Sequence, residues 1–62
     1  MIGYLEGKAT HLQVDSCFLN VSGVGYRIFI SAMTRQKITI GANVLLFTYL
    51  HVREDALLLY GF

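Results

Sequence analysis

Proline is absent from this chain of 62 residues, cysteine occurs once, and charged residues make up only 15% of it. Without proline, turns depend on glycine, asparagine, aspartate and serine. The single Cys17 has no partner for an internal disulfide, which fits a reducing compartment. Unbroken apolar runs are short, and the longest are Val44 to Phe47 and Ala56 to Tyr60. Because a membrane-spanning helix needs about 20 apolar residues, none is expected.

Hydrophobic residues are abundant, at 55% of the chain, where roughly 45–50% is usual for a soluble domain. This content excludes intrinsic disorder. A chain of this size buries only about 60% of its unfolded surface, so part of the apolar surface is expected to face a partner. The net charge is only +1, which makes a poor basic patch for a free-standing nucleic-acid binder. Composition therefore predicts one small module that does not act alone.

The glycines divide the chain into short apolar segments with the alternation of β-strands. Ser31 is a suitable N-cap for one helical turn, and the nearly continuous apolar segment that starts at Val44 is typical of a buried central strand or a barrel strand. We expect strands over 1–13, 17–22, 24–30, 44–50 and 56–62, and the helical turn over 32–36.

Five strands in so short a chain imply a strongly curved sheet. Closure of the sheet removes its unpaired edges, and the glycine-rich first strand can curl as at a barrel corner. The prediction is an all-β fold, a small five- to six-stranded OB-fold barrel with one helical turn, and an SH3-like barrel is the alternative. Among the residues that carry the argument, we expect Cys17, Tyr26, Phe47 and Tyr60 in the core, and Tyr4, Phe18 and Phe29 on the polar side.

An acidic pair, Glu54-Asp55, interrupts the last two apolar segments. Two adjacent carboxylates between strands project from a loop into solvent, and on the residues alone an ordinary solvated hairpin explains them. His51 lies three residues before the pair, with His11 and Cys17 elsewhere, but nothing fixes a ligand geometry. We therefore expect no metal.

The sequence contains no recognisable set of catalytic residues. Gly23-x-Gly25 lacks the third glycine and the following helix of a phosphate-binding loop. Cys17 on an apolar strand face is better explained as a small core residue than as a nucleophile. The sequence thus predicts a non-enzymatic domain without a cofactor.

Three local patterns occur in order along the chain. They are Met1-Ile2-Gly3-x-Leu5-x-Gly7, then Gly23-Val24-Gly25-Tyr26, and last Phe47-Thr48 followed by Val52-Arg53-Glu54-Asp55-Ala56 and Leu59-Tyr60-Gly61-Phe62. Together they resemble the N-terminal domain of the RuvA family, bacterial proteins that bind Holliday junctions. The resemblance covers essentially the whole chain.

The resemblance implies that residues 1–62 are the OB-fold first domain of a homotetramer in the bacterial cytoplasm. Members support branch migration of four-way DNA junctions in recombination and in the repair of DNA damage, including the SOS response. The ATPase belongs to the hexameric partner RuvB. Helix-hairpin-helix elements and a motor-binding domain follow in the family and are absent from these 62 residues, so we expect weak junction binding by this chain alone.

The resemblance also implies roles for single residues. Glu54 and Asp55 match the acidic pin of the family, which lies near the point of strand exchange. Arg53 either pairs with a nearby carboxylate or contacts a phosphate. Two alternatives stay open, a self-association barrel with no nucleic-acid role, and a generic single-strand DNA binder that uses exposed rings such as Tyr4 and Phe18.

Overall fold

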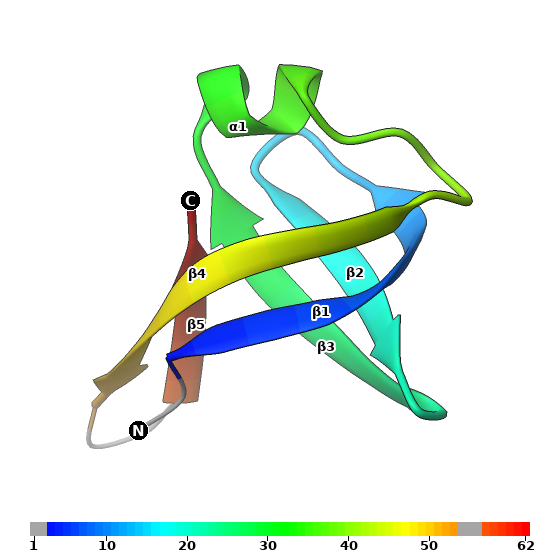
Figure 1. Cartoon of the computed structure of the whole chain (residues 1–62). Coiled ribbons are helices and arrows are strands. Elements are labelled where there is room, and N and C mark those ends of the chain that lie inside the picture. The colour runs from blue at the N-terminus through cyan, green and yellow to red at the C-terminus, as the bar shows by residue number, and fades with distance from the viewer. Residues whose placement is uncertain (1–2, 54–56) are drawn as a thin grey trace.

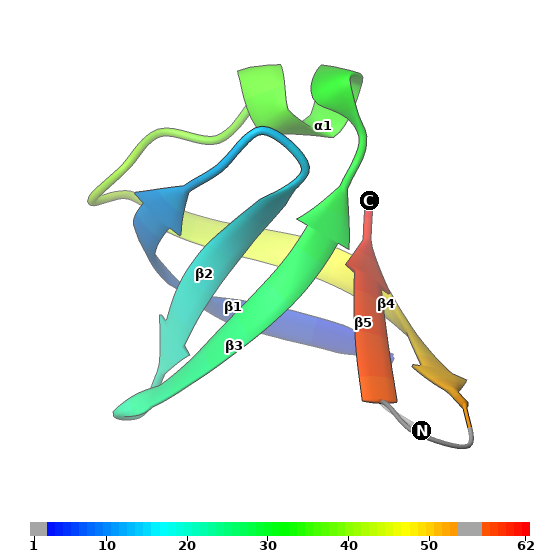
Figure 2. The same ribbon diagram turned by 180° about the vertical axis from the view of Figure 1, so that it is seen from behind.

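The computed structural model describes residues 3–53 and 57–62. Its strands close into a barrel in the order β1-β2-β3-β5-β4, and the α1 helix connects β3 to β4 (Figures 1 and 2). The elements are β1 (Tyr4–Leu12), β2 (Ser16–Val21), β3 (Val24–Ile30), α1 (Ala32–Gln36), β4 (Asn43–Val52) and β5 (Leu57–Gly61). The predicted all-β, five-stranded OB-fold barrel is confirmed.

A two-residue turn joins β2 to β3. Val21 pairs with Val24, and the intervening Ser22 and Gly23 have φ angles of 52° and 90°. Two successive positive φ angles match the twist of a tight hairpin. The side-chain oxygen of Asn20 accepts a hydrogen bond of 2.8 Å from the Gly23 N–H.

The barrel closes through β1, which pairs antiparallel with both β2 and β4, and through the parallel pairing of β3 with β5. An irregularity in the register between Ala9 and His11 marks where β1 bends. Gly7 lies where the backbone passes close to β2, because a Cβ atom there would come within 2.4 Å of the Asn20 carbonyl oxygen. The glycine of β1 is therefore required by close approach of two strands.

The core is aliphatic and lies inside the barrel. Its buried members are Leu5, Ala9, Cys17, Leu19, Ile28, Ile30, Ile38 and Leu46. The predicted burial of Cys17 is confirmed, and this burial raises the pKa of its thiol by penalising the thiolate. A thiol of that kind packs as a small apolar group rather than acting as a nucleophile.

Two aromatic residues expected in the core are outside it. Phe47 is 58% exposed and Tyr60 is 41% exposed, so both predictions were wrong. In β4 the neighbours Leu46 and Thr48 point inward and are buried, and the alternation of a strand then turns Phe47 outward. The nearly continuous apolar run had hidden this alternation.

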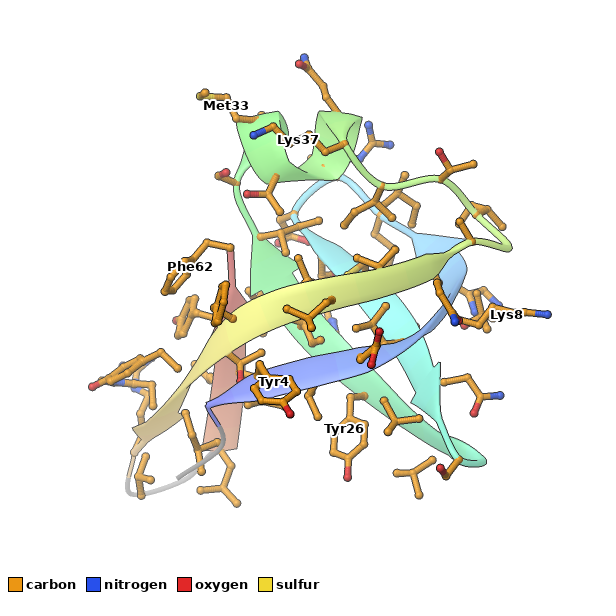
Figure 3. The ribbon with its side chains drawn as sticks, viewed as in Figure 1. Tyr4, Lys8, Tyr26, Met33, Lys37 and Phe62 are labelled. Carbon is orange, nitrogen blue, oxygen red and sulfur yellow. The ribbon has the colours of Figure 1, made fainter. Side chains whose placement is uncertain are left out.

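The remaining predictions on aromatic residues concern Tyr26, Tyr4, Phe18 and Phe29. Tyr26 is half-buried and packs against the core, at the end of the barrel away from α1 (Figure 3). Tyr4 is 59% exposed, as expected, whereas Phe18 and Phe29 are half-buried on the outer side.

Helix α1 lies at one end of the barrel (Figure 1). Its N-cap is Ser31, whose hydroxyl oxygen accepts a hydrogen bond of 3.2 Å from the Thr34 N–H, and this confirms the predicted cap. The helix itself has no buried residue, but Ile38 just after it belongs to the core. In the described part of the chain, no helix has the length and apolar character needed to cross a membrane.

Candidate nucleic-acid interface

The β4–β5 hairpin supports the segment in which the acidic pair lies. The two strands pair antiparallel from Thr48 opposite Gly61 to Val52 opposite Leu57. This last pair brackets residues 53–56. Glu54 and Asp55 lie outside the described residues, so their predicted position at a loop tip stays a prediction.

Arg53 is the one predicted site residue that the structure describes. It follows directly after β4 and is exposed. The two roles predicted for it, a local ion pair and a phosphate contact, stay predictions.

A cluster of rings covers the outer side of β3, β5 and β4. The ring centroids of Phe29 and Tyr60 lie 5.8 Å apart, those of Tyr60 and His51 6.3 Å, and those of His51 and Tyr49 6.2 Å. The guanidinium carbon of Arg27 lies 4.9 Å from the Phe29 ring centroid, within the range of cation–π attraction. We call these five residues the cation–ring face.

A second outer surface lies on β1, β4 and the C-terminal residue. Its exposed side chains are Tyr4, Leu45, Phe47 and Phe62. Tyr4 pairs with Phe47 in the register of β1 and β4, and Phe47 and Phe62 exchange backbone hydrogen bonds of 3.0 and 2.9 Å. Phe62 points away from the barrel (Figure 3). We call these four residues the apolar face; the exposed Glu6, which is the register partner of Leu45, borders it.

The sequence did not reveal the cation–ring face. The sequence places Phe29 on the polar side but Tyr60 in the core, so it does not bring these two rings together. The pairing of β3 with β5 brings Phe29 beside Tyr60. A signal was present in the alternation of β3, which places Arg27 and Phe29 on one face.

The histidines do not form a metal cluster with the other described residues. His11 packs edge-on against Phe18, at 5.6 Å between ring centroids, while His51 packs among the rings of β4 and β5. Within residues 3–53 and 57–62, no three His, Cys, Asp or Glu side chains are grouped so that they could hold a metal ion.

The geometry thus defines an OB-fold barrel with exposed rings and with an acidic sequence between its last two strands. The family model of the RuvA N-terminal domain matches residues 1–61. This chain therefore belongs to the RuvA family, as the sequence motifs had indicated.

Individual relatives give the same result. The chain is 48% identical to a protein of Chlorobium limicola, 49% identical to one of Magnetococcus marinus and 48% identical to one of Rickettsia bellii. Each relative is named Holliday junction branch migration complex subunit RuvA. The matches cover 100% of this chain but only 30–31% of the relatives, so the chain spans about a third of their length.

Proposed function

We propose that this chain is a scaffold domain of a Holliday junction complex and that Glu54 and Asp55 act at the strand crossover. The similarity of the whole chain to subunits named for branch migration supports this role. In this proposal the domain is non-catalytic and works within a homotetramer, in the bacterial cytoplasm. The partner RuvB supplies the ATPase, and the bound DNA is a four-way junction.

The observation that supports the proposal is the strand pairing on either side of the acidic pair. In sequence the pair falls between Val52 and Leu57, which are partners at the end of a continuous antiparallel ladder. A ladder of this kind holds the ends of the intervening segment in a fixed position. Two carboxylates held by such a strand pair can exert an electrostatic force on DNA at a fixed position.

The physical effect of the pair is repulsion. A carboxylate and a phosphate about 6 Å apart repel by about 0.7 kcal/mol in bulk water, and by about 3 kcal/mol at an effective dielectric near 20. Repulsion lowers affinity, so attraction to the DNA has to come from cations elsewhere in the assembly. What the carboxylates contribute is separation, because they keep phosphates away from the centre and favour unpairing of the bases that cross it.

The test uses a chimera in which this chain replaces the matching third of the Chlorobium limicola relative. In the chimera, Glu54→Gln combined with Asp55→Asn should leave junction affinity unchanged or raise it by about threefold, the equivalent of about 0.7 kcal/mol. Gel-shift titration measures the affinity. A fluorescent base analogue at the crossover should report less unpairing, and the rate of branch migration should change.

Glu6→Gln is the matched control, because Glu6 is an exposed carboxylate on β1 away from the β4–β5 connection. It should change neither unpairing nor migration. A loss of junction affinity of about tenfold or more in the double variant, with the control unaffected, would show that the pair attracts the junction and would overturn the proposal.

A further inference from the structure

A shallow pocket of about 370 Å³ opens where β3 and β5 end. The two strands run parallel and side by side, with their C-terminal ends towards α1 (Figure 2). The pocket is lined by Asp15, Phe29, Ile30, Ser31, Tyr60 and Gly61. Most of this lining is apolar, and Asp15, an exposed residue before β2, is the one charged residue in it. A pocket of this type suits a flat apolar ligand with polar edges.

Two rings of the cation–ring face also line this pocket. Phe29 and Tyr60 are register partners on β3 and β5, and their ring planes are inclined by 38°. Phe29 is half-buried, which fixes it against the barrel, whereas Tyr60 is 41% exposed and accessible to a ligand. A firmly packed ring beside an accessible one provides a stacking surface for a planar group.

A cation lies beside this stacking surface. The Arg27 guanidinium is placed over the Phe29 ring, and its Nε donates a long hydrogen bond of 3.5 Å to the Ser16 hydroxyl. Arg27 is exposed, and the partners of its side chain within the described residues are the Phe29 ring and the Ser16 hydroxyl. Its charge is therefore available to a ligand, and the planar guanidinium matches the geometry of phosphate as well as of carboxylate groups.

We propose that this pocket binds one unpaired base of single-stranded DNA. The base stacks on Phe29 and Tyr60, the adjoining phosphate contacts Arg27, and the Asp15 carboxylate accepts a hydrogen bond from the base edge. Rings together with a cation are the combination that single-strand binding proteins use. The apolar face has exposed rings but no cation, which makes the cation–ring face the better site for nucleic acid.

Asp15 predicts a preference among bases. A carboxylate accepts hydrogen bonds and donates none. Cytosine presents an exocyclic amino group, with which Asp and Glu pair in base recognition, whereas thymine presents carbonyl acceptors and a methyl group in the same place. We therefore expect oligo-dC to bind more tightly than oligo-dT.

This site goes beyond the proposed function, because it involves neither Glu54 nor Asp55 and needs no junction. The test accordingly uses the 62-residue chain and short single-stranded oligo-dC and oligo-dT at low salt. Amide chemical shifts in an NMR titration report binding and also show whether each variant is folded. We expect shift changes at the residues that line the pocket.

Tyr60→Leu should weaken oligo-dC binding by roughly 5- to 150-fold, the equivalent of the 1–3 kcal/mol of one base stacked on a ring. Tyr60→Phe keeps the ring and should restore the affinity. Phe47→Leu on the apolar face is the matched control and should bind like the parent chain. If Tyr60→Leu binds like the parent, or Phe47→Leu weakens binding equally, the assignment of the pocket is wrong.

Two further variants test the polar groups. Arg27→Gln should reduce the slope of log affinity against log salt by about 0.7, the value for one phosphate contact on a single strand. Asp15→Ala should remove the preference for oligo-dC over oligo-dT. Absence of shift changes at the pocket with millimolar oligonucleotide overturns the proposal, and it leaves the junction assay of the chimera unaffected, so the two proposals fail separately.

Discussion

The two faces of β4 have similar compositions and opposite environments. Leu46 and Thr48 point into the barrel and are 4% and 6% exposed. Leu45, Phe47 and Tyr49 alternate with them and point outward, each 46% exposed or more. Residue hydrophobicity does not distinguish the two sets. Closure of the barrel decides which set is buried, because only one face of each strand can turn inward.

The outer surface is itself divided. Both the cation–ring face and the apolar face display large side chains, and the first also includes a guanidinium and borders the pocket described above. A surface with rings and a cation suits nucleic acid, whereas a largely apolar patch is typical of a protein contact. Two chemically distinct exposed surfaces on so small a domain agree with the high hydrophobic content of the chain.

The sharpest test of the inner and outer faces of β4 compares two adjacent leucines. Leu46→Ala should destabilise the chain by about 2–5 kcal/mol, because it removes buried methyl groups and leaves a cavity. Leu45→Ala, at a 46% exposed position, should cost no more than about 0.5 kcal/mol. Urea unfolding followed by circular dichroism measures both. Equal costs would mean that the two faces do not differ as described.

A second test compares two glycine positions on either side of the start of β1, Gly7 within the strand and Gly3 just before it. At Gly7 an added Cβ would come within 2.4 Å of a carbonyl oxygen of β2, whereas at Gly3 it would meet no atom of the described residues within 4 Å. Gly7→Ala should therefore destabilise the barrel by about 1–3 kcal/mol through displaced backbone, and Gly3→Ala should be nearly neutral. The change in thermal midpoint measures each effect. A neutral Gly7→Ala would show that β1 and β2 do not approach closely there.

The smallest expected effect concerns a position that belongs to neither face. Ser22 has a φ of 52° in the turn between β2 and β3. Asparagine tolerates this conformation better than other non-glycine residues, and Asn-Gly is the favoured sequence for this turn. Ser22→Asn should raise the unfolding free energy by about 0.5 kcal/mol, measured by urea unfolding. Ser22→Ala is the control and should give no gain, and a loss with Ser22→Asn would contradict the turn assignment.

Most of the fold could be predicted from local patterns. Alternation in 17–22 and 24–30 identified the inward residues Cys17, Leu19 and Ile28, and Ser31 marked the start of the helix. The run at 44–50 did not reveal its inner face, because leucine and aromatic residues occur on both sides of β4. The parallel pairing of β3 with β5 is set by closure of the whole sheet, so no local pattern predicts it.

The candidate sites divide in the same way. Glu54 and Asp55 could be singled out because they are adjacent in sequence and match a family motif. The pocket could not, because its main side chains come from separate segments, Asp15 before β2, Phe29 on β3 and Tyr60 on β5. Sequence patterns report neighbours along a strand, whereas this pocket depends on neighbours across strands.

The parallel pairing of β3 with β5 has a consequence for synthesis of the chain. Residues Leu59 to Gly61 supply the partners of Ile28 to Ile30, and β5 also pairs with β4. Until the ribosome has synthesised β5, β3 and β4 each have an unpaired edge that can associate with other chains. Closure must await the last strand, so a pause in translation before β5 would prolong the interval in which chaperones are needed.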